Sequence, residues 1–117
     1  MGGQGALGRY GERLAADYLA AGGMRILDRN WRCAEGEIDI VAQDGDTLVI
    51  VEVKTRSCRR HGTAFEAVTG AKLHRLRRLA ARWLAARRER PDPPRVGAVR
   101  IDVVALERFA GAFTVRH

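Results

Sequence analysis

Two segments decide the fold of this chain: Gly36-Glu37-Ile38-Asp39-Ile40-Val41-Ala42 and Thr47-Leu48-Val49-Ile50-Val51-Glu52-Val53-Lys54. Both are rich in β-branched residues, and Asp44-Gly45 lies between them. This pattern predicts two strands joined as a β-hairpin. Because side chains alternate between the faces of a strand, the second strand should carry the residues between its valines on one face and the valines on the other. The first of these faces comprises Leu48, Ile50, Glu52 and Lys54.

Charged residues replace the apolar ones where this second strand ends. Glu52 and Lys54 follow Leu48 and Ile50 on the same face, and a buried strand rarely carries such residues without a partner. On the first strand, alternation places Glu37, Asp39 and Val41 on one face. Neighbouring strands run about 5 Å apart, so an acid of the first strand and Glu52 are expected to lie close together. Carboxylates converging beside a lysine predict a divalent-metal site, and Mg²⁺ prefers carboxylates, water and phosphate oxygens.

Composition indicates the setting of such a site. The chain has 117 residues, a formal charge of +7 and an isoelectric point near 10.6, which favours polyanionic partners, nucleic acid before an acidic membrane surface. No segment has the length and apolarity of a membrane span, and the first residues lack the pattern of a signal peptide. Cys33 and Cys58 form no CxxC motif and predict reduced thiols in a cytoplasmic protein.

Lysine is rare in this basic chain. Of the 21 basic residues, only Lys54 and Lys72 are lysine, and the other 19 are arginine. Lysine supplies a compact ammonium with an adjustable pKa, which arginine does not. Chance placement is the alternative, but the position of Lys54 beside Glu52 strengthens the prediction of a site.

The remaining elements predict one domain over residues 1–117. Residues 5–21 form an amphipathic helix with Glu12 at the edge of its apolar stripe, either as an ordinary boundary residue or as one more carboxylate of the site. Met24 to Arg32 reads as a strand, residues 70–90 as a second helix, and Val96 to Leu106 as another strand with an edge strand after it. This order predicts an α/β fold with a mixed sheet flanked by helices.

Basic residues near the site predict contacts with a phosphate backbone. Thr55 to Thr63 is polar and aperiodic, so we expect an exposed loop there, with Arg56, Arg59 and Arg60 as its phosphate contacts; a merely solvated loop is the alternative. The second helix begins after Thr69, a candidate N-cap. Its flank carries Arg75, and its first turn carries Lys72, where the helix dipole disfavours a cation. A nearby anion would explain that lysine.

The sequence resembles the YraN-like family of uncharacterised bacterial proteins, within the PD-(D/E)xK nuclease superfamily. The motifs that carry the resemblance span almost the whole chain. They are Gly8-Arg-Tyr-Gly-Glu12, Arg29-Asn30-Trp31, Gly36-Glu37-Ile38-Asp39, Val51-Glu52-Val53-Lys54-Thr55-Arg56, Lys72, Arg100-Ile101-Asp102-Val103-Val104 and Ala112-Phe113.

This resemblance implies a restriction-endonuclease-like fold, similar to that of archaeal Holliday-junction resolvases. It implies that Asp39 and Glu52 bind Mg²⁺ or Mn²⁺, that Glu12 completes the metal shell, and that Lys54 assists the attacking water. Glu37 is the alternative acid, which can instead hold Arg32 or a backbone group.

Function is less securely implied than fold, because one fold hosts many functions. The first hypothesis is a metal-dependent endonuclease, acting on DNA rather than RNA, selective for junctions or flaps and able to work as a homodimer. The second is a nucleic-acid-binding or repair-associated protein that kept the fold and no longer cuts. A third is a binder of an acidic protein partner whose carboxylates form structural ion pairs.

Overall fold

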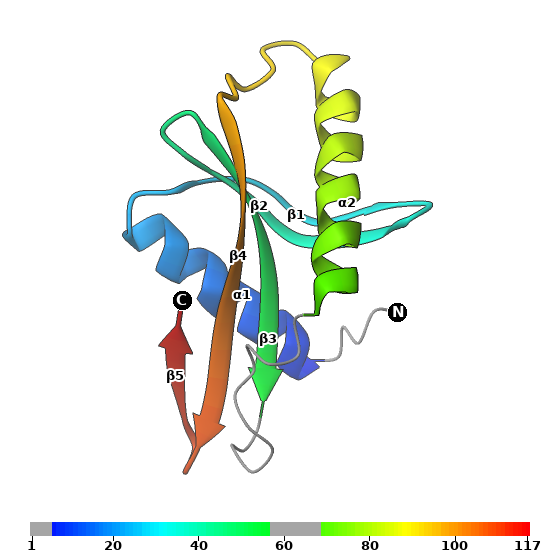
Figure 1. The fold of residues 1–117 in the computed structure, drawn as a ribbon. Coiled ribbons are helices and arrows are strands. Elements are labelled where there is room, and N and C mark those ends of the chain that lie inside the picture. The colour runs from blue at the N-terminus through cyan, green and yellow to red at the C-terminus, as the bar shows by residue number, and fades with distance from the viewer. Residues whose placement is uncertain (1–5, 57–68) are drawn as a thin grey trace.

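The computed structural model describes residues 6–56 and 69–117. Within them, five strands form one sheet in the order β1-β2-β3-β4-β5, and two helices pack against it (Figure 1). The elements follow the predicted order, and they are α1 (Ala6–Ala21), β1 (Arg25–Cys33), β2 (Gly36–Asp44), β3 (Thr47–Arg56), α2 (Gly70–Arg88), β4 (Ala98–Phe109) and β5 (Ala112–Arg116).

Strand pairing makes the sheet mixed, as predicted. β1, β2 and β3 form an antiparallel meander, and β4 and β5 pair antiparallel as well. β3 and β4 run parallel over their whole paired length, from Thr47 opposite Ala98 to Arg56 opposite Glu107. The chain between them includes α2, because parallel neighbours require a crossover connection. The result is an α/β architecture consistent with a restriction-endonuclease-like fold.

Each face of the sheet contributes to its own hydrophobic cluster. On one face Val49 and Val51 of β3 pack with buried residues of α1, including Leu19. On the other face Leu48 and Ile50 pack with α2. The alternation predicted for β3 is therefore confirmed, and it directs the residues that follow on the second face, Glu52 and Lys54, toward the α2 side. A strand buried on both faces reads as a continuous apolar run, which explains the sequence of β3.

The alternation of β2 is interrupted at Asp39. Ile38 belongs to the cluster on the α2 face, whereas Ile40 belongs to the cluster on the α1 face, although strict alternation would put both on the same side. Val41 packs on the α2 face with Ile38. The expectation that Val41 shares a face with Glu37 and Asp39 is therefore wrong, because the strand changes phase between the acids and Val41.

Two hydrogen bonds define the position of helix α2, and the sequence suggests only the first of them. The Thr69 side chain accepts a hydrogen bond from the Lys72 amide at 3.2 Å, which confirms the predicted N-cap. Further along, the buried Trp83 donates its indole N–H to Asp28 of β1 at 3.1 Å. The cap defines the start of α2 and the position of Lys72 within it, and the Trp83–Asp28 hydrogen bond ties the helix to β1.

The prediction that an exposed loop begins at Thr55 is wrong for Thr55 and Arg56. Thr55 and Arg56 belong to β3 and pair in register with Leu106 and Glu107 of β4. The parallel ladder with β4 extends the strand past the point where the sequence loses its apolar pattern. Arg59 and Arg60 lie outside the residues that the structure describes.

Candidate metal and lysine site

Strands β2 and β3 stop pairing at the position of the predicted site. Their register runs from Asp44 opposite Thr47 to Ile40 opposite Val51, and no further pair follows toward Asp39. Instead, the Asp39 carboxylate accepts a hydrogen bond from the Val53 amide at 2.8 Å. The side chain thus takes the place of a backbone acceptor. This contact fixes Asp39 against the short segment that carries Glu52 and Lys54.

Three carboxylates converge at this opening of the sheet. Each of three residues offers one carboxylate oxygen, and these three oxygens lie within 4.8 Å of one another. The residues are Glu12 of α1 and Glu37 and Asp39 of β2. Glu12 is only 2% exposed, and Glu37 and Asp39 are half-buried. Glu37 also lies near Arg32, with 3.7 Å between its Oε2 and the arginine Nε. The sequence left open whether Glu37 joins the acids of the site or holds Arg32, and in the structure it lies near both.

Close packing of α1 against β3 brings Glu12 to this cluster. Gly11, the residue before Glu12, leaves so little room that a Cβ atom built on it would lie 2.5 Å from Thr55 Oγ1. A larger residue would require the Thr55 side chain or the helix to shift. The glycine thereby permits the short approach that carries Glu12 over the end of β3.

Burial and the neighbouring carboxylates both disfavour the charged form of Asp39. Burial, together with the negative charges of Glu52, Glu12 and Glu37, raises the pKa of Asp39 to about 7, while the Val53 hydrogen bond acts in the opposite direction. A carboxyl group with such a pKa holds a proton under mildly acidic conditions. A bound cation would counteract this rise in pKa, because its positive charge would stabilise the ionised carboxylates.

Glu52 holds two lysines from different elements. Its Oε2 lies 3.1 Å from Lys54 Nζ on the same strand and 2.9 Å from Lys72 Nζ on α2. Glu52 is therefore the anion that explains the cation in the first turn of α2. The only two lysines of the chain meet at one carboxylate oxygen, next to the acids of β2.

The two lysines differ in their electrostatics. Burial and the neighbouring Lys72 lower the pKa of Lys54, and its contact with Glu52 only partly offsets this. Burial also acts against the charge of Lys72, but its contacts with Lys54 and Glu52 prevail and raise its pKa. Lys54 is thus the member of the pair that releases a proton more readily.

The donor atoms of the carboxylate cluster suit a hard divalent cation. Carboxylate oxygens are the ligands that Mg²⁺, Mn²⁺ and Ca²⁺ prefer, and the cluster offers no sulfur or imidazole that would favour Zn²⁺. The Glu37 Oε2 atom is buried and accepts no hydrogen bond from the residues that the structure describes. Arg32 Nε lies 3.7 Å from the same oxygen, so a cation bound there would compete with this ion pair.

The other predicted site residues that the structure describes lie on the strand and the helix that carry the two lysines. Arg56 is half-buried at the end of β3, two positions after Lys54, and Arg75 is exposed on α2, one turn after Lys72. Glu37, which the sequence offered as the alternative acid, belongs to the carboxylate group. Glu52 lies beside the two lysines, and its role as a metal ligand stays a prediction. The spacing of Glu37 and Asp39, two residues apart on one strand, is the signal that placed both acids on one face in the sequence.

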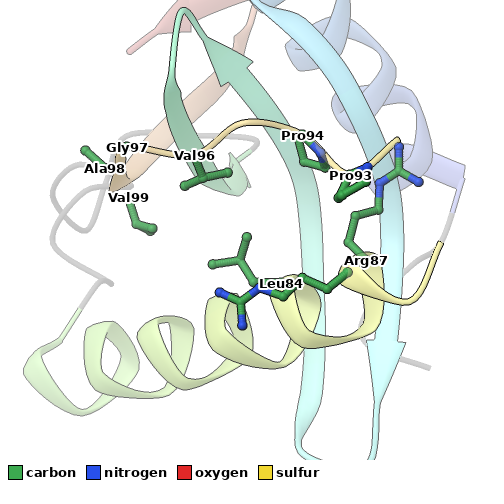
Figure 2. Close-up of a pocket in the computed structure, with 9 residues that line it drawn as sticks. Leu84, Arg87, Pro93, Pro94, Val96, Gly97, Ala98 and Val99 are labelled. Carbon is green, nitrogen blue, oxygen red and sulfur yellow. The ribbon is translucent and has the colours of Figure 1, made fainter. Parts of the chain in front are cut away.

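The hollow in Figure 2 lies elsewhere. It is formed between the C-terminal part of α2 and the segment that leads into β4, and its lining includes Leu84, Arg87, Val96 and Val99. None of the clustered carboxylates or lysines lines it. Among the described residues, no helix has the length and apolarity needed to cross a membrane.

The fold and the site together define a class, an α/β protein of restriction-endonuclease-like architecture with an acidic group that can hold a metal ion. Residues 11–106 match the model of "Uncharacterised protein family UPF0102". The chain belongs to the UPF0102 family, which is the YraN-like family that its motifs resemble.

Relatives support this assignment over nearly the full chain. A UPF0102 protein of Frankia alni is 58% identical over 96% of this chain and 90% of its own length. A UPF0102 protein of Kineococcus radiotolerans is 57% identical over 96% of this chain and 89% of its own length. The names of these relatives state no activity.

Proposed function

We propose that this protein is a metal-dependent endonuclease that hydrolyses phosphodiester bonds of DNA. One contact carries the proposal, the hydrogen bond between Asp39 and the Val53 amide. It links the carboxylate cluster around Asp39 to the strand segment where Glu52 contacts two lysines. Hydrolysis of a phosphodiester requires charge neutralisation at the phosphate and activation of a water molecule. The two groups provide residues of the right chemistry for both tasks.

In this proposal Glu12, Glu37 and Asp39 hold Mg²⁺ or Mn²⁺, with Glu52 close enough to raise the pKa of Asp39 and to complete the acidic surroundings. The bound cation supplies Lewis acidity, which lowers the pKa of a coordinated water and stabilises negative charge on the phosphate. The hydrogen bond from Val53 keeps the Asp39 carboxylate oriented.

Lys54 and Lys72 divide the remaining tasks. Lys54, with its lowered pKa, orients the attacking water as an ammonium, or accepts a proton from it when it is a neutral amine and so becomes the ammonium. Lys72, which keeps its proton more firmly, binds a phosphate oxygen of the strand that is cut. Their shared contact with Glu52 holds both ammonium groups in place before the substrate arrives.

The first test is a cleavage assay with Mn²⁺ and labelled duplex, single-stranded, flap and four-way-junction DNA, with one RNA substrate alongside. We expect cutting by the parent protein and none by Asp39→Ala from the same preparation procedure. The preferred substrate would identify the structural selectivity. If both proteins bind DNA and neither cuts it, the endonuclease proposal is contradicted, and the non-catalytic candidate described next remains.

A non-catalytic nucleic-acid-binding or repair-associated protein is the second candidate. The net charge of +7 and the exposed arginines of α2, such as Arg75, favour nucleic-acid binding whether or not the bond is cut. The cysteine pattern predicts the cytoplasm as the setting for either function, and the only cysteine that the structure describes, Cys33, is free.

Salt dependence should separate nucleic acid from an acidic protein as the partner. For DNA, the logarithm of the association constant should fall with the logarithm of salt concentration with a slope of about −0.9 for each phosphate neutralised. Fluorescence anisotropy between 50 and 300 mM salt measures it. We expect Arg75→Met to reduce the magnitude of the slope by about one unit. A slope near zero for the parent would instead favour the protein partner.

A further inference from the structure

Part of strand β4 has a free outer edge. One edge of β4 pairs with β3 over residues 98–107, and the other pairs with β5 only from Ala105 to Phe109. In the described part of the chain, no strand pairs with the outer edge of residues 98–104. Figure 1 shows β5 beside only the end of β4 that leads into their hairpin.

The turn into β5 determines which backbone groups point outward from this edge. Ala110 and Gly111 have φ values of 54° and 81°, as a two-residue type I′ hairpin requires. Phe109 and Ala112 are then a hydrogen-bonded pair, and such pairs alternate along an antiparallel ladder. Odd-numbered residues of β4 therefore direct their N–H and C=O groups outward. Because the β3–β4 register has no shift, Val99, Ile101 and Val103 continue this pattern.

The opposite edge of the sheet is irregular. β1 has a register shift between Ile26 and Asp28, and Asn30 adopts a φ of 53°. Bulges and left-handed residues are common devices that prevent an edge strand from pairing with another chain. The free part of β4 has neither device, since none of its residues has a positive φ. Unlike β1, the free part of β4 is regular and suited to strand addition, whereas β5, the outermost strand beside it, has only five residues.

Side chains along the free β4 edge are complementary to a second copy of themselves. The segment reads Val99-Arg100-Ile101-Asp102-Val103. In an antiparallel pair related by a two-fold axis at Ile101, Val99 lies opposite Val103 of the second copy. Arg100 then lies opposite Asp102 of the second copy, in a non-hydrogen-bonded position where side chains are closest. Each Arg100 of the pair would then face an Asp102 of the other copy.

We propose that this protein forms a homodimer through antiparallel pairing of its β4 strands, centred on Ile101. The outward N–H and C=O groups of Val99, Ile101 and Val103 would form the ladder between the copies. Within one chain, Arg100 Nε and Asp102 Oδ1 already lie 2.9 Å apart, Asp102 also contacts His117 at 2.7 Å, and Arg100 lies 3.5 Å from Asp44. Pairing between the copies would add Arg100–Asp102 contacts to these and would require the His117 side chain to make room beside Asp102. This surface and its partner go beyond the proposed nuclease function and do not depend on it.

Apolar exposure at the same edge supports a second copy as the occupant. Val99 is 46% exposed, one of few large hydrophobic side chains so exposed among the described residues. It lines an open hollow between β4 and α2, together with Leu73, Arg77, Ala80 and Ile101. Pairing would place Val103 of the second copy beside Val99 and reduce its contact with water. A second shallow hollow at this edge is lined by Ile101, Asp102, Val103 and His117.

The two-fold arrangement has a consequence for function. A two-fold axis that relates two antiparallel strands is normal to the sheet, so both α2 helices would lie on the same side of a continuous sheet. The basic face of α2 in each copy, represented by Arg77, would then form one surface. Such a surface can contact a single nucleic-acid molecule, if the proposed function holds.

Exchange of the two charges tests the dimer without nucleic acid. Arg100→Asp gives a strand with two acids, and Asp102→Arg gives a strand with two arginines. In sedimentation equilibrium from 5 to 200 µM, we expect the parent to dimerise and each variant to dimerise about tenfold or more weakly. Mixed in equal amounts, the two variants should form a heterodimer of near-parental affinity. Arg25→Asp, on the other edge strand, should leave the dimer unchanged.

Several outcomes would overturn the proposal. A parent protein that stays monomeric at 200 µM would do so, as would folded variants that keep the parental dimer or a mixture that stays monomeric. If either charge variant fails to fold by circular dichroism, Val99→Pro replaces it, because the Val99 N–H points outward and is not needed for pairing with β3. A folded Val99→Pro protein with the parental dimer affinity would likewise exclude this edge.

Discussion

Replacement of Asp39 by asparagine is expected to abolish Mn²⁺ binding and DNA cutting while stabilising the metal-free protein at pH 8. Asp39 belongs to the carboxylate cluster and also accepts a hydrogen bond from the β3 segment that carries Glu52 and Lys54, and asparagine removes its charge. Asparagine retains an oxygen that can accept the Val53 hydrogen bond, so the strand contact survives. The two effects have opposite signs, which separates loss of a ligand from general damage.

The stabilisation follows from the raised pKa of Asp39. Its pKa is about 7 in the folded protein and 3.8 as a model value for the unfolded chain. Between these values the folded chain keeps a proton that the unfolded chain releases, so stability decreases as pH rises through this range and the penalty is complete above pH 7. The full shift sets an upper limit of about 4 kcal/mol. Because Asp39 is only half-buried, we expect ~1–2 kcal/mol, or roughly 5 °C in melting temperature.

Melting curves at pH 5 and pH 8 and calorimetry with Mn²⁺ test this prediction. At pH 5 the parent and Asp39→Asn should melt within about 2 °C of each other, because most of the penalty is absent there. Metal affinity of the parent should decrease about tenfold for each pH unit below 7, since the ligand must lose its proton. Asp17→Asn, on the exposed face of α1, is the matched control. Parental Mn²⁺ binding by Asp39→Asn would exclude this carboxylate as a ligand.

Replacement of Lys54 by methionine is expected to reduce cutting by about 100-fold or more while leaving Mn²⁺ affinity within a few-fold of the parent. Methionine has a similar length and removes the ammonium group that lies 3.1 Å from Glu52 Oε2. The lowered pKa of Lys54 makes it the proposed partner of the attacking water, a role that contributes to the rate and not to metal binding. Single-turnover cleavage and calorimetry measure the two quantities.

Variants of the second lysine and of a nearby arginine act as controls for this experiment. Lys72→Arg keeps a positive charge beside Glu52, so we expect DNA binding to change little and cutting to decrease more. Arg75→Met, one turn further along α2, should weaken binding alone. Equal cutting by Lys54→Met and the parent would assign Lys54 a structural role as a partner of Glu52.

Much of the fold was predictable because its signals are local. Period-two alternation in β3 determined that Glu52 and Lys54 face the side where Leu48 and Ile50 pack, and the structure confirms this through the cluster on the α2 face. Thr69 identified the start of α2 for a similar reason, since an N-cap acts within one turn. The end of β3 was misjudged because its last residues are held by pairing with β4, which the sequence of β3 does not encode.

By itself the sequence determined the order of the elements, the mixed sheet, the face on which Glu52 lies and the oddity of a lysine in the first turn of α2. Only the tertiary structure decided the neighbours: that Glu37 joins Glu12 and Asp39, and that Glu52 meets Lys72. Periodicity specifies the side of its own element on which a residue lies. Which residue of another element it meets depends on packing, on the close approach at Gly11 and on the change of phase in β2 at Asp39.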